Sequence, residues 1–319
     1  MRVGLVVDAT CDLPPEFLAA HDIRVLPIGI RLGERRIIDA RDVETTARFY
    51  AEDLPKVGPE DASEPLSAAE TQRWFLDELV TDFDYVICLT VTRQRSPIFE
   101  NATQASFSLL QNYHERRNSA GISGPFTLRV IDSRTVFGGL GALAAEGARL
   151  IAEGGHPNAV RTRLEELSHQ MSTFVIADDL GHVRRRGFQK GERNKLGDRL
   201  RGAFLGIGSM LDMKPVLSLV QGEDKPVSVS PSYEKSAERL LTFAMARVEA
   251  GDLLAPQLCL SYAGDPSALR DLPGFAALEE SCRAHGVQLN LAMLSPTGGI
   301  NLGAGAMSIG FAAPPVPFN

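Results

Sequence analysis

Residues 3–16 read VGLVVDATCDLPPE and contain three successive local signals. Residues 3–7 form a short, β-branched apolar run, which is typical of a strand buried on both faces of a sheet. The polar residues 8–12 predict a loop. Pro14 and Pro15 then favour the start of a helix, because proline is tolerated in the first helical turn. This stretch therefore predicts a strand, a loop and a helix in succession.

The same pattern continues through the first half of the chain. Apolar runs predict further strands at residues 23–30, 85–91 and 126–131. A helix is expected around residues 140–151, where apolar and small side chains recur at helical spacing on one face. Repeated strand–loop–helix units predict a mainly parallel sheet with helices on both faces, which is an α/β/α sandwich.

The second half of the chain predicts a different sheet. Residues 154–157, GGHP, interrupt the pattern, so we expect an N-terminal α/β domain at 1–155 and a C-terminal α/β domain at 156–319. Strands joined by both a hairpin and helices indicate a mixed sheet in the second domain. Its expected elements are a helix at 157–169, a strand at 174–177, a hairpin at 213–220 and 226–229, and strands at 258–262 and 287–292.

Composition limits the class of protein. The chain has 319 residues, 44% of them hydrophobic and 23% charged, as in an ordinary folded protein of two domains. A formal net charge of -7 gives no general attraction to nucleic acid or to an anionic membrane. Four scattered cysteines without a CxxC pair predict free thiols, and no apolar run approaches the roughly 18 residues of a membrane span. We therefore expect a cytoplasmic protein without stable membrane insertion.

Polar loops follow several of the expected strands, and ligands bind at the carboxyl ends of parallel strands. Hydroxyl and carboxylate groups occur in four loops, at residues 8–10, 61–65, 90–96 and 132–133. Hydroxyls and backbone amides at helix starts suit a carboxylate or a phosphate. Alternatively, Ser63, Ser96 and Ser133 are helix N-caps. The two roles are compatible, because a capped helix start can still hold an anion.

Common enzyme signatures are missing from the sequence. It contains no GxGxxG after the first strand, no GxxxxGK[ST], no GxSxG and no HExxH, and we expect no metal or cofactor. The run Gly138-Gly139-Leu140-Gly141 is a weak match to a phosphate loop, and close helix packing explains it better. None of the six histidines has a catalytic setting, and His182 and His285 lie in polar stretches that predict solvation.

The segment from Arg184 to Arg201 is basic. It holds eight Lys or Arg residues against Glu192 and Asp198, which gives a net charge of +6. Either these side chains solvate a helical face, or they form a patch for a phosphate group or an acidic partner. Nucleic acid is disfavoured as the partner, because the whole chain is acidic and this segment holds few aromatic side chains. Residues considered as partner or phosphate contacts are Arg185, Arg186 and Lys190.

Taken together, short motifs in a fixed order resemble the DegV family of bacterial fatty-acid-binding proteins from the first strand to Phe311. The motifs that carry the resemblance are Asp8-Ala9-Thr10, Leu26-Pro27-Ile28, Asp39 with Phe49-Tyr50, Ala62-Ser63-Glu64-Pro65, Thr90 to Phe99 with Asn101-Ala102, Asp132-Ser133 with Gly139 and Gly141, Asp178-Asp179-Leu180, Lys214-Pro215-Val216-Leu217, and Asn301 to Gly305 with Gly310-Phe311.

The resemblance implies a long-chain fatty acid in a tunnel between two domains, with its carboxylate held by polar residues. The carboxylate-holding hydroxyls of the family correspond to Ser63 and Ser96. The neighbouring motif positions are Thr10, Ala62 and Asn301. Three positions depart from the family pattern: Ala62 replaces a threonine, Asn301 replaces a histidine, and Phe188 replaces an arginine. A neutral Asn can donate a hydrogen bond to a carboxylate but cannot supply charge to it.

Three functions remain open from the sequence. The leading hypothesis is a non-catalytic lipid carrier, and the resemblance implies that such carriers present the acid to a separate ATP-dependent fatty acid kinase. The second is an enzyme acting on an acyl or phosphorylated small molecule, with Asp8 or Asp132 as general base and the basic segment as a phosphate clamp. Against it, no local motif pairs a His, Cys or Lys with Ser63 or Ser96. The third is a regulatory module that binds another apolar ligand.

Overall fold

The computed structural model describes residues 1–186, 213–220 and 223–318. Its first sheet has four parallel strands in the order β2-β1-β6-β7. The strands are β1 (Val3–Asp8), β2 (Ile23–Leu26), β6 (Tyr85–Thr90) and β7 (Thr127–Asp132). The parallel sheet predicted from the apolar runs is confirmed, and β1 and β6 are buried over almost their whole length, as strands covered on both faces must be.

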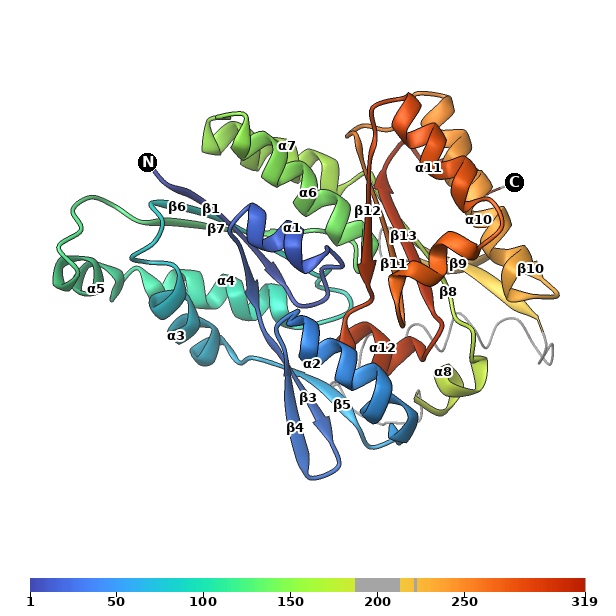
Figure 1. The fold of residues 1–319 in the computed structure, drawn as a ribbon. Coiled ribbons are helices and arrows are strands. Elements are labelled where there is room, and N and C mark those ends of the chain that lie inside the picture. The colour runs from blue at the N-terminus through green and yellow to red at the C-terminus, as the bar shows by residue number, and fades with distance from the viewer. Residues whose placement is uncertain (187–212, 221–222, 319) are drawn as a thin grey trace.

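Helices cover both faces of this sheet. One face carries α3 (Ala68–Glu78) and α4 (Ile98–Leu109), followed by α5 (Tyr113–Ser119). The other face carries α6 (Gly138–Ala152) and α7 (Pro157–Ser168). Figure 1 shows the two pairs of helices on opposite sides of β1, β6 and β7, with α1 (Pro15–Ala20) near α6. The predicted α/β/α sandwich is therefore confirmed.

The second sheet has six strands and mixed pairing. Their order is β10-β9-β8-β13-β11-β12, and only β11 and β12 are parallel. The strands are β8 (Met171–Ile176), β9 (Lys214–Val220), β10 (Glu223–Ser230), β11 (Gln257–Tyr262), β12 (Gln288–Met293) and β13 (Met307–Ala312). Its outer face is covered by α10 (Tyr233–Glu249) and α11 (Phe275–Ala284), with a 3-10 turn at Pro266–Asp271 (Figure 1). The mixed sheet and its hairpin are confirmed, whereas β13 was not predicted.

Helix α6 lies between the two large sheets. It contacts β1 and β6 on one side and β11, β13 and β8 on the other. Its glycines allow this close approach: a Cβ atom added to Gly138 would lie 2.8 Å from the Cys259 carbonyl oxygen, and one added to Gly141 would lie 2.7 Å from the Asp12 carbonyl oxygen. The close-packing interpretation of these glycines is therefore confirmed.

A small antiparallel sheet, in the order β4-β3-β5, extends from the first sheet. Its strands are β3 (Ile28–Leu32), β4 (Arg35–Asp39) and β5 (Ala62–Pro65). The expectation of one continuous strand at residues 23–30 is wrong: β2 ends before Pro27 and β3 begins after it, in another sheet. Proline has no backbone N–H for the sheet ladder, so the strand breaks there.

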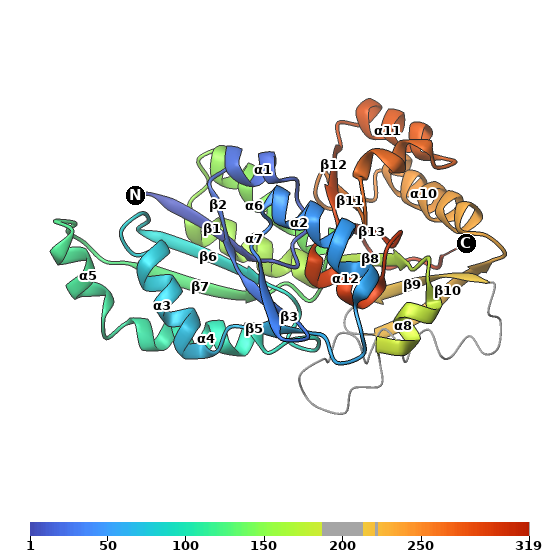
Figure 2. The ribbon, with the colours of Figure 1, turned by 60° about the horizontal axis from the view of Figure 1, so that its bottom comes forward.

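The remaining helical elements are short. They are α2 (Val43–Arg48), the π-helical turn Phe49–Asp53, the 3-10 turn Leu54–Lys56, α8 (Leu180–Arg186) and α12 (Pro296–Leu302). Helix α12 contacts β3, β5 and α8, and the turned view in Figure 2 shows it beside α8. Segments far apart in the sequence therefore meet at α12.

The structure bears differently on two expectations, the serine N-caps and the domain boundary at residue 155. The N-cap alternative is wrong for all three serines. Ser63 lies on strand β5, and the N-caps of α4 and α6 are Pro97 and Phe137. The actual cap of α3 is Ser67, which forms a capping box with Glu70. The division at residue 155 stays a prediction, and α7, which follows it, packs on α6 and β7.

Candidate functional site

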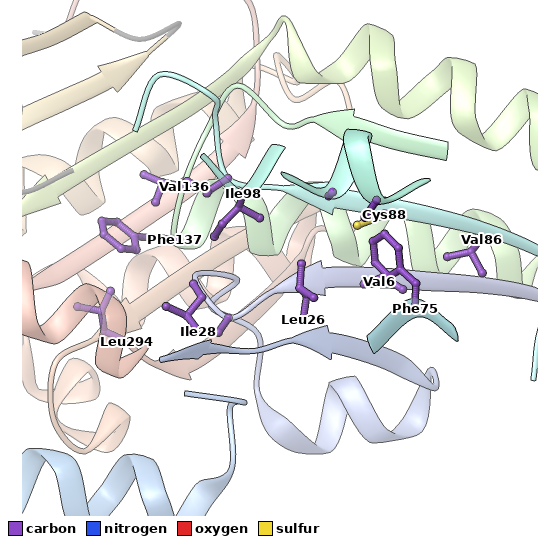
Figure 3. Close-up of a cluster of buried hydrophobic side chains, with 14 of the residues drawn as sticks. Val6, Leu26, Ile28, Phe75, Val86, Cys88, Ile98, Val136, Phe137 and Leu294 are labelled. Carbon is purple, nitrogen blue, oxygen red and sulfur yellow. The ribbon is translucent and has the colours of Figure 1, made fainter. Parts of the chain in front are cut away.

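A long apolar cluster runs from the first sheet into the second half of the chain. It includes side chains between the first sheet and helices α3 and α4, such as Val6, Phe75 and Cys88, and continues to Leu294, which lies just before α12 (Figure 3). Members along that continuation are Ile28, Ile98, Val136, Phe137, Leu180, Val183, Leu217, Leu219, Leu294 and Leu302. We call this set the long apolar cluster. It is one continuous cluster of buried side chains that packs against both large sheets.

The predicted head-group residues lie on elements that adjoin this cluster. Ser63 is half-buried on β5, and Ser96 is half-buried just before α4, where its Oγ accepts a 3.4 Å hydrogen bond from the Ile98 amide. The two segments are joined by Asn101, whose Nδ2 donates to the Leu66 carbonyl at 2.8 Å. Helix α12, which carries Asn301, contacts β5 directly. The structure therefore brings the three elements together.

Asn301 is almost completely buried in α12. Its Nδ2 donates to the Thr297 carbonyl at 2.8 Å, which uses one of the two amide hydrogens. Its Oδ1 has no hydrogen-bond partner among the described residues. A buried acceptor without a partner costs free energy, so such an atom is a candidate for a ligand contact. The amide can offer one further N–H to an acceptor and its oxygen to a donor.

His182 lies beside the same turn of α12, contrary to the prediction that it is solvated. Only 8% of its surface is exposed, and its Nε2 lies 3.0 Å from the Ile300 carbonyl oxygen. A Cβ atom added to Gly303 would lie 3.1 Å from the imidazole ring. The polar sequence around His182 gave no signal of burial, because the contact joins residues 118 positions apart.

The other two predicted positions, Thr10 and Ala62, are both buried. Thr10 donates its hydroxyl to Asp8 Oδ1 at 2.6 Å, and Ala62 is 3% exposed opposite Arg31 in the β3–β5 pair. Asp8 also accepts the amides of Thr10 and Val91, at 2.9 and 2.5 Å. Burial raises the pKa of Asp8, and its hydrogen bonds oppose that rise. Asp8 therefore connects the loop after β1 to the loop after β6 through hydrogen bonds.

Asp132 is the other base considered for the enzyme hypothesis, and like Asp8 it ends a strand of the first sheet and accepts several hydrogen bonds. It accepts hydrogen bonds from Arg93 Nε at 3.0 Å and from the Arg134 amide at 3.0 Å. A hollow of about 190 Å³ lies beside it and is lined by Thr92, Arg93, Gln94, Asp132 and Arg134. Asp132 is therefore already paired with a guanidinium group at the carboxyl end of β7.

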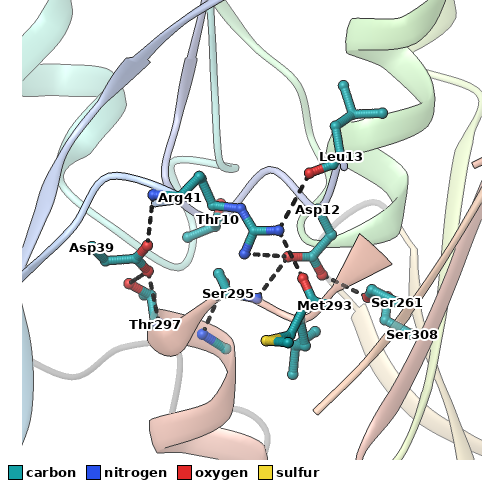
Figure 4. Close-up of polar contacts among 12 residues, drawn as sticks. Thr10, Asp12, Leu13, Asp39, Arg41, Ser261, Met293, Ser295, Thr297 and Ser308 are labelled. Atoms are coloured by element: carbon teal, nitrogen blue, oxygen red, sulfur yellow. Dashed lines mark hydrogen bonds and ion pairs between the residues drawn. The ribbon is translucent and has the colours of Figure 1, made fainter. Parts of the chain in front are cut away.

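A buried polar network that the sequence did not predict joins the two halves of the chain. Asp12 accepts the Ser261 hydroxyl at 2.6 Å and the Ser295 amide at 2.9 Å, and its Oδ1 lies 3.7 Å from Arg41 Nη1 (Figure 4). Arg41 Nη2 donates to the Met293 carbonyl at 2.7 Å. Burial raises the pKa of Asp12 to about 6, and the Arg41 charge opposes that rise.

The same network fixes the start of α12. Asp39 accepts both the amide and the hydroxyl of Thr297, at 2.9 and 2.7 Å, and Ser295 caps the helix by accepting the Gly298 amide at 3.0 Å (Figure 4). Tyr50 donates its hydroxyl to the Leu294 carbonyl at 2.9 Å. These contacts hold the helix that carries Asn301, so they position the candidate site.

A second buried ion pair crosses between the halves at Ser96. Arg95, the preceding residue, pairs through Nη2 with the carboxylate of Asp224 on β10. Both side chains are nearly inaccessible, with 2% and 6% of their surfaces exposed. The sequence reading did not single out either residue.

The basic residues proposed as partner contacts are only partly described. Arg185 and Arg186 lie in α8. Lys190 lies outside the described residues, as does Phe188. Helix α8 contacts α12, so the described beginning of the basic segment lies next to the helix that carries Asn301.

The described part of the chain offers neither a metal site nor a membrane-spanning helix. No group of three or more His, Cys, Asp or Glu side chains there is arranged to hold a metal ion. No helix within it is both long and apolar enough to cross a bilayer. The four cysteines are buried free thiols.

Comparison with known proteins identifies the family. A family model described as "Uncharacterised protein, DegV family" matches residues 2–314. The chain belongs to the DegV family. A DegV domain-containing protein of Xanthomonas axonopodis pv. citri is 43% identical over 319 residues, covering 100% of both chains.

Solved structures of the DegV family have the same fold. A DegV family protein from Thermus thermophilus, described for its fatty acid binding, has a TM-score of 0.74 at 21% identity, covering 98% of this chain and 100% of that one. A stearic acid-binding protein from Eubacterium ventriosum has a TM-score of 0.74 at 19% identity, covering 98% of each chain. The DegV resemblance read from the sequence motifs and the α/β fold expected from it are both confirmed.

Proposed function

We propose that this protein binds a long-chain fatty acid in a tunnel between its two domains and is a carrier without catalytic residues of its own. Family membership supports the proposal, and the observation that carries it is the long apolar cluster shared by both halves of the chain. The acyl chain lies along this cluster in our proposal. Its carboxylate lies among Ser63, Ser96 and Asn301, with Thr10 and Ala62 nearby.

Burial of the acyl chain alone can supply the binding free energy that a long-chain fatty acid needs, so few polar groups are required at the head-group end. Each buried methylene contributes about 0.8 kcal/mol, so about fourteen methylenes contribute on the order of 11 kcal/mol. Micromolar affinity needs only about 8 kcal/mol. Part of this burial free energy is offset by the translational, rotational and conformational entropy that the ligand loses on binding. The acyl chain therefore dominates affinity in this proposal, and the head-group residues determine which end group is accepted.

We further propose that the carboxylate end is presented to a separate ATP-dependent kinase. Support comes from the place of Asn301: it lies on α12, which contacts α8, where the basic segment begins. A partner that reached this end would meet the head group before the acyl chain.

Organic extraction of the purified protein followed by mass spectrometry tests the lipid proposal. We expect a long-chain fatty acid in the extract, whereas a polar small molecule without lipid would favour the enzyme hypothesis. The protein stripped of lipid should then bind hexadecanoic acid in a titration. Failure to bind it, with no lipid in the extract, would refute the proposal.

Serine substitutions test the head-group assignment in the same titration. Ser63→Ala and Ser96→Ala should each weaken hexadecanoic acid binding by a few-fold, because each removes one hydrogen bond to the carboxylate. Ser67→Ala is the matched control, since Ser67 is an exposed serine that caps α3 four residues from Ser63. If all three variants bind the acid equally, the head group lies elsewhere.

A further inference from the structure

The ion pair between Arg95 and Asp224 stands at the edge of the long apolar cluster. Asp224 is paired in register with Leu219 across β9 and β10, and Pro226 in the same way with Leu217. Leu217 and Leu219 both belong to the long apolar cluster. Cross-strand partners share one face of a sheet, so Asp224 faces the same side as these leucines.

Arg95 reaches this point from the other half of the chain. It directly precedes Ser96, and Ile98, two residues after Ser96, also belongs to the long apolar cluster. The guanidinium group of Arg95 is buried against Asp224, on the side of β9 and β10 that carries Leu217 and Leu219.

The chemistry of this pair matches the chemistry of the ligand. A guanidinium group has five N–H donors in a planar fork that fits a carboxylate, and such charge-assisted hydrogen bonds are stronger than neutral ones. Asp224 now supplies that carboxylate from within the chain. A fatty acid carries the same group at its head, so the two carboxylates are equivalent ligands for Arg95.

The other candidate head-group residues cannot supply a positive charge. Ser63, Ser96 and Asn301 are neutral, and Asn301 already uses one amide hydrogen on the Thr297 carbonyl. A buried carboxylate is stable only when it is paired or well hydrogen-bonded. Arg95 is a buried cation, and it directly precedes the proposed ligand residue Ser96 in the sequence.

We propose that Arg95 is the cationic anchor for the fatty acid carboxylate and that Asp224 is an internal competitor for it. This inference rests on the proposed function. Ligand binding exchanges one carboxylate for another on Arg95 and so releases a contact between the loop after β6 and strand β10. Specificity for an acid over a neutral lipid comes from Arg95, and Asp224 sets how tightly the acid is held.

Titrations with hexadecanoic acid and hexadecanol, on protein stripped of lipid, test this assignment. Asp224→Asn keeps the side-chain shape but removes the competing charge, so we expect it to bind the acid about tenfold more tightly with unchanged affinity for the alcohol. Arg95→Gln should bind the acid at least about tenfold more weakly, again with the alcohol unchanged. Arg95→Lys keeps the positive charge but loses the planar fork of N–H donors. Its affinity for the acid should therefore lie between those of the wild type and Arg95→Gln.

Glu223→Gln is the matched control for Asp224→Asn. Glu223 is the preceding carboxylate on β10, but it is exposed and pairs with Lys225, so its substitution should leave both affinities unchanged. Hexadecanol binding also reports that each variant is folded. If Arg95→Gln does not fold, Asp224→Asn alone decides the question.

The outcomes separate this inference from the proposed function. If the wild type binds neither acid nor alcohol, the proposed function itself fails. If the wild type binds the acid but Asp224→Asn binds it no more tightly, the anchor assignment is overturned. The assignment is also overturned if acid and alcohol affinities change together in the variants, because the pair would then only hold the two halves together.

Discussion

Replacing Gly310 by alanine should separate α6 from the second sheet. Gly310 lies on β13, and a Cβ atom there would lie 2.0 Å from the amide nitrogen of Gly139 and 2.3 Å from the carbonyl carbon of Gly138. Real Cβ atoms essentially never come closer than 3.0 Å to another heavy atom. The atoms in the way are backbone, so no side chain can rotate to make room. Helix α6 would have to move by about 1 Å.

The size of the effect follows from what α6 contacts. It packs on β1 and β6 of the first sheet as well as on β11 and β13 of the second, so it cannot shift without opening one of these interfaces. Overpacking a well-filled interior typically costs about 1–3 kcal/mol. The added Cβ atom would clash with backbone atoms of α6, which cannot rotate away. We therefore expect Gly310→Ala to lower the free energy of unfolding by about 3 kcal/mol or more.

Gly147→Ala in the same helix is the control. There the added Cβ atom would lie 3.1 Å from Leu164 Cδ1, the end of a flexible side chain. Alanine is favoured over glycine inside a helix by up to about 1 kcal/mol, so this variant should be as stable as the wild type or more stable. Both are measured by denaturant unfolding of the full chain. A Gly310→Ala variant within about 1 kcal/mol of the wild type would show that α6 is not held by this backbone contact.

Two further predictions concern the buried Asp12 and the basic segment. Because burial raises the pKa of Asp12 to about 6, the folded chain binds this proton more tightly than the unfolded chain, and stability falls as the pH rises from about 4 to about 6. Lowering the pH from 7 to 5 should therefore stabilise the wild type relative to Asp12→Asn by about 1 kcal/mol in unfolding titrations, and an opposite sign would contradict the assigned shift. Reversal of Arg185, Arg186 and Lys190 to Glu should slow association with a kinase partner, more so at low salt, while hexadecanoic acid affinity stays constant. Equal effects on both measurements, or on neither, would contradict a docking role for these residues.

The order of strands and helices could be read from the sequence wherever local pattern decides structure. The apolar run at residues 3–7 and the periodic face of residues 140–151 became β1 and α6, because both signals lie within one element. Strand β13 was missed because it contains Gly310. A glycine weakens the strand signal, and the reason for it lies on α6, far away in the sequence.

The candidate site was harder to predict, because its contacts join distant residues. Ser63 was read as a possible helix cap, although the capping box begins at Ser67, four residues later. Asp12 and Arg41 were not singled out at all. Arg41 contacts the Met293 carbonyl across 252 positions, and Asp12 contacts the Ser295 amide across 283. No local pattern carries information over such separations, so these residues emerge only once the chain is folded.

Two buried arginines, Arg41 and Arg95, join the halves of the chain, and they differ in whether a ligand could replace their hydrogen-bond partner. Arg41 donates to the backbone carbonyls of Leu13 and Met293, and its neighbour Asp12 also holds the Ser295 amide, so moving either would leave buried backbone groups without partners. That network can position α12, but exchanging its partners is costly. Arg95 instead faces a side-chain carboxylate, next to Ser96 and the long apolar cluster. A ligand carboxylate can reproduce that contact, which is why we assign specificity to Arg95 and a structural role to Arg41.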